Sequence, residues 1–264
     1  HAHGDHLANH REIIASAATA RLMRARMPGK RAETILPFGA PTEMRGARLT
    51  LLAAGHILGS AQVVLDVKED QRKFRFLFSG DVGRPGQDIL RDPEAVENVD
   101  FLQIESTYGA REHQDAPNSL EELERLVGGA LKRGGKVIIP AFSVGRTQLL
   151  VYEFHKLIEA ERIPVVPMYV DSPLSVNATE VFRLHPECFD EETYKFLQEH
   201  GNPFGLANLV YIREVSISKT LNEMKGPCVI ISASGMAEAG RIRHHLANHG
   251  GDPNNLILFV GFCA

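Results

Sequence analysis

The first six residues of this 264-residue chain contain three histidines and one aspartate, in the order His1-Ala-His3-Gly-Asp5-His6. Imidazole nitrogens and carboxylate oxygens together are typical ligands of zinc and similar divalent ions. If His1 and His3 leave a strand, their alternate spacing aims both side chains the same way, and Asp5 and His6 would then reach a second ion. A purification-tag remnant would not normally interleave Asp and Gly. The motif therefore predicts a metal site that the fold has to complete.

Two residues further along the chain fit the same site. His56 lies in Gly-His-Ile-Leu-Gly-Ser, between two predicted strands, and Asp81 lies in Ser-Gly-Asp-Val-Gly after another strand. Alone, His56 would more often be a structural histidine and Asp81 a turn cap. Together with the opening motif they give four histidines and two carboxylates at successive strand ends, which predicts a metal centre.

Composition places few limits on function. Hydrophobic residues make up 44% and charged residues 23%, as in a soluble globular protein, and no apolar run approaches the length of a membrane span. The cysteines, Cys188, Cys228 and Cys263, include no CxxC pair, so we expect a reduced, cytoplasmic compartment. The net charge of −4 does not indicate a nucleic-acid binder, but a groove can be locally positive. Of two basic clusters, residues 21–31 and 241–245, the first is most simply a solvated helix face.

Hydrophobic patterning predicts an α/β chain with a boundary near residue 117. In residues 1–117 we expect a helix at 12–27 and strands at 48–53, 62–67, 74–78 and 100–104. In residues 118–264 we expect helices at 119–133, 145–161, 176–184 and 240–248, and strands at 136–140, 165–170, 228–232 and 255–260. Strands that alternate with helices predict a mainly parallel sheet, and ligands of such sheets bind at the carboxyl ends of the strands.

The two ends of the sequence also carry an expectation. The chain opens on His1 without a methionine, and it closes on the apolar run 260–264. We expect a fragment of a longer protein that lacks both ends.

Seven sequence blocks carry a family resemblance. HAHGDH, AAGHILGSAQ, FSGDVGR and IESTYG, in that order, resemble the metallo-β-lactamase fold. IPAFSVGRTQ, VDSPLSVNATEVF and ISASGMAEAGRIRHHL resemble its β-CASP branch, which includes RNase J and the endonuclease subunit of the eukaryotic pre-mRNA cleavage complex. The resemblance implies a partial metallo-β-lactamase αββα sandwich (1–117), followed by a β-CASP domain with a mainly parallel sheet flanked by helices (118–264), truncated at its C-terminal end.

The resemblance also implies roles for individual residues. His1, His3 and His56 would bind one zinc, Asp5 and His6 a second, and Asp81 would bridge the two; Mn²⁺ is the alternative metal. Glu105, in IESTYG, matches the acidic residue of the first β-CASP motif, and with Asp5 it is the expected catalytic residue. Two departures matter: the later histidines of the family lie beyond residue 264, and the segment between the first two motifs is short. The second metal site is therefore expected to be incomplete, and whether the fragment is active by itself stays open.

These inferences predict a two-zinc hydrolase of phosphodiester bonds in nucleic acid, most simply a ribonuclease acting on single-stranded RNA. Two ions can activate a bound water near neutral pH and stabilise charge on phosphorus. The expected phosphate contacts are Arg146, Ser232, Ser234 and Gly235. Three alternatives stay open: a DNA exonuclease of the same fold, a small-molecule metallo-hydrolase, and a non-catalytic scaffold. The second domain argues against a small substrate, and the filled ligand positions argue against a scaffold. Endonuclease or 5′-exonuclease mode, sequence preference and a homodimer are left open.

Overall fold

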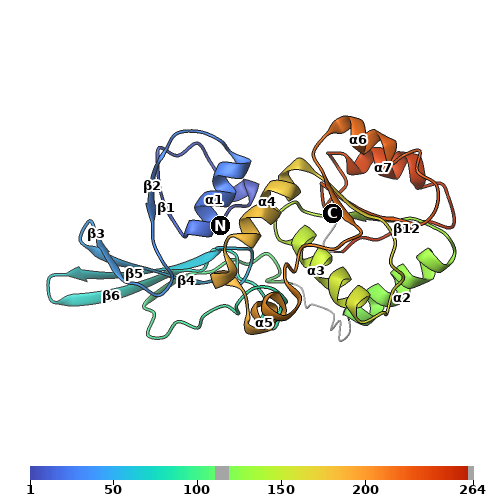
Figure 1. Cartoon of the computed structure of the whole chain (residues 1–264). Coiled ribbons are helices and arrows are strands. Elements are labelled where there is room, and N and C mark those ends of the chain that lie inside the picture. Colours follow the sequence, from blue (N-terminus) through green and yellow to red (C-terminus); the bar gives the residue numbers. More distant parts are fainter. Residues whose placement is uncertain (111–118, 261–264) are drawn as a thin grey trace. The chain divides into compact units, whose positions relative to one another are not determined.

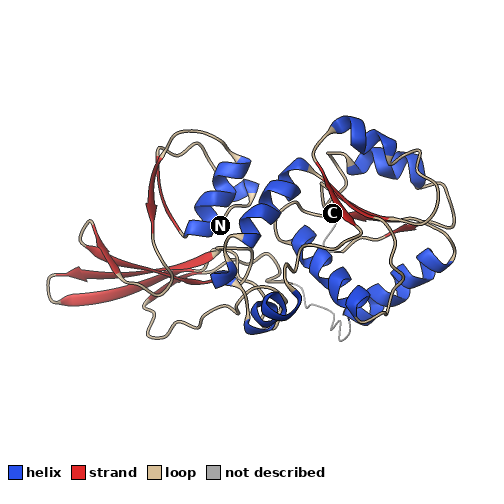
Figure 2. Ribbon diagram, viewed as in Figure 1, coloured by secondary structure: helices blue, strands red, loops and turns tan. Residues whose placement is uncertain are grey.

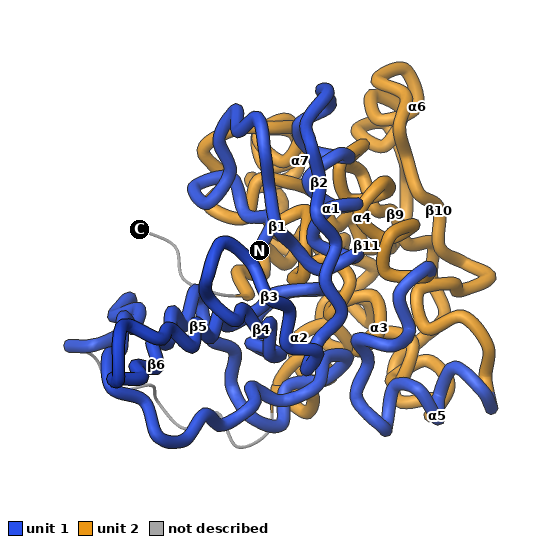
Figure 3. The backbone as a smooth tube through the Cα atoms, turned by 90° about the vertical axis from the view of Figure 1, so that its left-hand side faces the viewer, with its two compact units in different colours: residues 1–113, 184–199 blue, residues 114–183, 200–264 orange. Residues whose placement is uncertain are grey.

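The computed structural model describes residues 1–110 and 119–260. The chain forms two compact units, drawn in different colours in Figure 3. Unit 1 consists of residues 1–113 and 184–199, and unit 2 of residues 114–183 and 200–264. The domain boundary near residue 117 stays a prediction. The return of residues 184–199 to unit 1 is a feature that the sequence did not reveal.

Unit 1 is built around a five-stranded sheet with the order β3-β4-β5-β6-β7. Its neighbours pair antiparallel except β6 and β7, which are parallel, and β1 and β2 form a separate parallel pair (Figure 1). The elements are η1 (Gly4–His6), β1 (Glu12–Ala15), α1 (Ala17–Arg26), β2 (Ala32–Ile35), β3 (Thr42–Met44), β4 (Ala47–Ala53), β5 (Ala61–Glu69), β6 (Arg72–Phe78), β7 (Phe101–Gln103), η2 (Pro186–Cys188) and α5 (Glu191–His200). The four strands predicted at 48–53, 62–67, 74–78 and 100–104 are confirmed as β4 to β7.

The predicted helix at residues 12–27 is wrong over its first part. Glu12–Ala15 is the strand β1, and the helix α1 begins only at Ala17. The β-branched pair Ile13-Ile14 suits a strand. Ser16 then caps the helix, because its Oγ accepts a hydrogen bond from the N–H of Thr19 at 3.2 Å.

Unit 2 has the predicted parallel sheet, with the order β10-β9-β11-β8-β12 and every pair parallel. Helices α6 and α7 lie on one side of it and α2 and α3 on the other (Figure 2). The central strands are fully buried and rich in Val and Ile, as expected of a sheet covered on both faces. The elements are α2 (Ser119–Lys132), β8 (Val137–Pro140), α3 (Arg146–Glu159), β9 (Met168–Asp171), α4 (Pro173–Arg183), β10 (Leu209–Ile212), α6 (Val215–Thr220), β11 (Val229–Ser232), α7 (Ile242–His249) and β12 (Leu256–Ile257).

Several details differ from the predicted pattern or fall outside it. Helices α5 and α6 and strand β10 were not predicted, and β12 is shorter than the expected strand at 255–260. Cys188 and Cys228 are buried and free, whereas Cys263 and the run 261–264 lie outside the described residues. Within the described part of the chain, no helix has the length and apolar character needed to cross a membrane.

Candidate functional site

Four of the predicted metal ligands converge in unit 1. His1, His3, His56 and Asp81 each offer one donor atom, and these four atoms all lie within 4.8 Å of one another. Nε2 of His1 is 3.1 Å and Nε2 of His56 is 3.5 Å from Oδ2 of Asp81, and Nε2 of His56 is 3.1 Å from Nδ1 of His3. The cluster therefore joins the start of the chain, the loop between β4 and β5, and the loop after β6.

Close packing of two glycine-containing loops holds His56 beside Asp81. The N–H of Gly83 donates to the carbonyl of Ala54 at 2.8 Å, and a Cβ on Gly83 would overlap the backbone of Gly55. Gly55 itself has φ +63°, a conformation that costs glycine little. Residues with side chains at these positions would separate the two loops and the predicted ligands that they carry.

Helix α1 fixes the other side of the His56 loop. The hydroxyls of Ser16 and Thr19 both donate to the carbonyl of Gly59, each at 2.7 Å. Gly59 has φ +75°, and a Cβ there would lie 2.6 Å from the backbone nitrogen of Thr19. The amino-terminal end of α1 is thus anchored on the loop that carries the predicted ligand His56.

The chemistry of the cluster fits a divalent metal ion. Among the residues that the structure describes, Nε2 of His1 has no hydrogen-bond partner, although its side chain is only 2% exposed and Oδ2 of Asp81 lies 3.1 Å away. Burial lowers the pKa of His56 below its ordinary value of 6.5, while Asp81 and Glu105 act in the opposite direction. A neutral imidazole is the form that binds a metal. A buried imidazole nitrogen and a neutral histidine beside one carboxylate fit a metal ligand set.

Asp5 and His6 lie at the edge of this cluster. Nε2 of His6 is 3.4 Å from Oδ1 of Asp81 and 3.8 Å from Oδ2 of Asp5. The Asp5 side chain is 79% exposed. The structure therefore brings His6 to the second oxygen of Asp81, while Asp5 faces solvent, and the second metal site stays a prediction.

Glu105 holds the loop that follows Asp81. Its carboxylate accepts hydrogen bonds from the N–H groups of Val82 at 3.0 Å and Thr107 at 3.3 Å, and its own N–H donates to Ser79 Oγ at 3.1 Å. Burial alone would raise the pKa of Glu105, but the hydrogen bonds from Thr107 and Val82 outweigh burial and keep the pKa below its ordinary value. Glu105 is therefore ionised at neutral pH.

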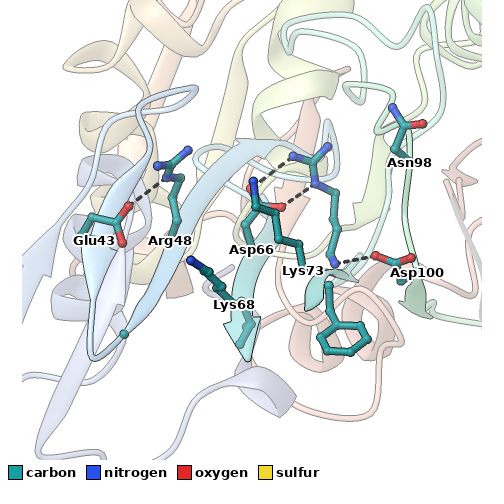
Figure 4. A pocket seen from close by; sticks show the side chains of 11 residues that line it. Glu43, Arg48, Asp66, Lys68, Lys73, Asn98 and Asp100 are labelled. Carbon is teal, nitrogen blue, oxygen red and sulfur yellow. Dashed lines mark hydrogen bonds and ion pairs between the residues drawn. The ribbon is translucent and has the colours of Figure 1, made fainter. Parts of the chain in front are cut away.

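A second hollow in unit 1 lies away from the metal cluster. It has a volume of about 760 Å³ and is lined by charged residues of β3 to β6 (Figure 4). Two of its three carboxylates are paired with arginines, Glu43 with Arg48 at 2.9 Å and Asp66 with Arg75 at 2.7 Å, and the third, Asp100, accepts a hydrogen bond from the backbone N–H of Arg75 at 2.8 Å. The residues that line this hollow include none of the predicted metal ligands, so the hollow is separate from the cluster around Asp81.

The predicted phosphate contacts all lie in unit 2. Ser232 is buried, and its hydroxyl donates to the carbonyl of Asp171 at 2.8 Å. The hydroxyl of Ser234 donates to the carbonyl of Ala239 at 3.2 Å, which closes the loop between β11 and α7. Gly235 is buried against the Phe142 ring, and Arg146 is exposed at the first position of α3. The Ser232 hydroxyl thus joins the carboxyl-terminal ends of β11 and β9. Contact between the predicted residues and a substrate stays a prediction.

Asp171, the last residue of β9, binds three side chains at the carboxyl-terminal edge of the sheet. The sequence did not single it out as a site residue. Its side chain is fully buried and accepts hydrogen bonds from Arg241 Nη1 at 2.7 Å and Ser218 Oγ at 2.6 Å, with His245 Nε2 at 2.8 Å. Burial would raise the pKa of Asp171, but the partners His245, Ser218 and Arg241 hold it below its ordinary value. We refer to these four side chains as the Asp171 network.

Comparisons with known proteins agree with these features. The Beta-Casp domain model matches residues 147–264. The chain is 35% identical over 228 residues to ribonuclease TTHA0252 of Thermus thermophilus, covering 86% of this chain and 51% of that protein. The chain belongs to the β-CASP family. This β-CASP chain is also 33% identical to an RNase J-like protein of Methanocaldococcus jannaschii, over 80% of this chain and 48% of that protein.

A solved structure supports the fold. A protein of unknown function from Enterococcus faecalis matches with a TM-score of 0.50 and 14% identity, over 89% of this chain and 57% of that one. The β-CASP chain spans about half the length of the curated relatives named above. The Beta-Casp match to residues 147–264, together with the mixed α/β structure and its parallel sheet, confirms the predicted fold class.

Proposed function

We propose that this β-CASP chain is the metal-binding and substrate-binding part of a cytoplasmic, two-zinc phosphodiesterase that hydrolyses RNA. The observation that carries the proposal is the convergence of four donor atoms from three separate segments, all within 4.8 Å of one another. The two relatives named above, a ribonuclease and an RNase J-like protein, support RNA as the substrate class.

The proposed ligand sets follow the donor geometry. His1, His3 and His56, with Asp81, would hold one zinc, and Asp81 would share a second with His6 and Asp5. When bound, a pair of such ions supplies Lewis-acid activation of water and of the phosphoryl group. Manganese would suit the carboxylates equally, so metal analysis is part of the test.

The chain's own side chains have separate proposed tasks. Asp5 presents an exposed carboxylate beside His6, where it can orient an incoming water and accept a proton on its oxygen. Glu105 holds the Val82 N–H and so positions the neighbouring ligand Asp81. Arg146, an exposed cation, and the Ser234-Gly235 turn in unit 2 are the proposed contacts for RNA phosphates.

The decisive experiment compares substrates on the intact, metal-loaded protein. Labelled single-stranded RNA and DNA of one sequence are assayed beside bis(p-nitrophenyl) phosphate, a thioester and a lactam, with Asp81→Ala as the inactive control. We expect RNA cleavage that Asp81→Ala abolishes, and about two metal ions per chain by elemental analysis. Hydrolysis of the thioester or lactam alone, or of DNA alone, would contradict the proposal. A metal content near zero would instead indicate a scaffold.

A further inference from the structure

Helix α1 carries one arginine that differs from its neighbours in the basic segment 21–31. Arg24 is paired with Glu33, and Arg31 donates to the carbonyl of Met27. Within the part of the chain that the structure describes, Arg26 has no ion pair, and its residue is exposed. A solvated helix face, the expectation from sequence, would leave such a side chain in solvent.

Arg26 instead lies against the metal-binding loop. A Cβ built on Gly4 would be 2.7 Å from Nη2, 3.2 Å from Cζ and 3.4 Å from Nε of Arg26. Gly4 stands between the predicted ligands His3 and Asp5, so glycine at this position leaves room for a guanidinium beside them. The sequence placed Gly4 in the motif but gave no sign of what occupies that room.

The helix that carries Arg26 is held at its amino-terminal end and along its inward side. Ser16 and Thr19 anchor its amino-terminal end on Gly59, which lies three residues after His56 in the same loop. Its inward side is buried through residues such as Leu22 and Met23. Ten helical residues span about 15 Å, so α1 reaches from the His56 loop to the Gly4 loop as one element.

The charge of the Arg26 guanidinium indicates which kind of ligand it can bind. A guanidinium is repelled by divalent cations bound beside it, and an anion that lies near both offsets this repulsion. Guanidinium binds phosphate oxygens in a bidentate manner and keeps its charge at any physiological pH. An exposed arginine without a carboxylate partner is therefore suited to a phosphate that approaches the metal centre from solvent.

We propose that Arg26 binds a backbone phosphate of single-stranded RNA that flanks the phosphate at the metal centre. The inference rests on the proposed function, because it assigns one contact of that same substrate. Arg26 would act as a substrate-binding residue, and it would add affinity without serving as a metal ligand.

The test measures RNA binding at several salt concentrations with Arg26→Ala and Arg26→Lys in the intact, metal-loaded protein. The matched control is Arg21→Ala, because Arg21 is an exposed arginine five residues earlier, about 140° around the same helix and about 7.5 Å along it. We expect Arg26→Ala to weaken binding roughly tenfold, and to make the slope of log K against log salt less steep by about 0.7. Arg26→Lys keeps the charge and should keep most of the slope while losing part of the affinity. Arg21→Ala should match the wild type, and metal content should be equal in all four proteins.

Two results would overturn the inference alone: RNA binding by Arg26→Ala equal to that of Arg21→Ala, or loss of metal from Arg26→Ala, which would make Arg26 a support of the ligand loop. Wild-type protein that neither binds nor cleaves RNA would overturn the proposed function as well. The two failures are therefore distinguishable.

Discussion

Replacing Arg241 with alanine removes the cation that faces the buried carboxylate of Asp171. The Asp171 side chain is fully buried and that of Arg241 is 18% exposed, so water screens their interaction weakly. Nη2 of Arg241 also donates to the carbonyl of Arg213 at 2.6 Å, a bond that the substitution removes too. The substitution therefore leaves a buried carboxylate short of one charged partner and a backbone carbonyl short of a donor.

The loss in the free energy of unfolding depends on the partners that Asp171 keeps. Breaking a buried ion pair by removing one partner costs about 3–5 kcal/mol. Because Ser218 and His245 still hold Asp171, we expect the lower end, about 3 kcal/mol of the free energy of unfolding of unit 2. With a typical urea dependence of about 2 kcal/mol per molar, this lowers the unfolding midpoint by about 1.5 M.

Hydrogen exchange in urea, followed in peptides from β9 and β11, reports the stability of unit 2 separately from unit 1. Arg243→Ala is the matched control, since this arginine is exposed on the same helix and its loss should change stability by about 0.5 kcal/mol or less. A midpoint for Arg241→Ala equal to that of Arg243→Ala would refute the reasoning, because the ion pair would then contribute nothing to stability.

Two further predictions concern metal and pH. His56→Ala should lower the metal content measured by elemental analysis with little change in far-ultraviolet circular dichroism, and unchanged metal content would remove His56 from the ligand set. Burial, with Lys136 and His245 nearby, holds the pKa of His249 below its ordinary value of 6.5. The unfolded chain thus takes up this proton at higher pH than the folded chain, so unit 2 should lose stability as pH falls below about 6.5. Urea unfolding at pH 8 and pH 5 measures this, and His249→Gln should reduce the difference; an equal loss in that variant would contradict the assignment.

Much of the fold was predictable because its strands are locally marked. The β-branched runs of β8 and β11 and the alternating pattern of β4 to β6 appear in the sequence as they do in the structure. Residues 12–15 were predicted as helix and form a strand, because a short run of Glu, Ile and Ala fits a helix nearly as well as a strand. Their pairing with β2, a contact between residues about 20 apart, decided the outcome.

The candidate site, like the fold, was predictable only in part. The proximity of His1, His3, His56 and Asp81 was predictable, because their residue types and their places at strand ends indicated where they gather, and their role as metal ligands stays a prediction. The surroundings were not predictable. Ser232 looks like a solvent-facing serine in sequence, yet its hydroxyl is used by the backbone of Asp171, more than sixty residues away along the chain.

The return of residues 184–199 to unit 1 affects the order in which the protein can mature. Asp190 donates its N–H to the carbonyl of Ile89 at 2.9 Å, and Phe189 bridges to Leu90, so part of the first unit is finished by chain made after α4. At about 5–20 residues per second, a ribosome needs several seconds to supply that segment. During this interval the nascent first unit would expose the surface around Leu90, and a chaperone that covers this surface would have to leave before the later segment could dock.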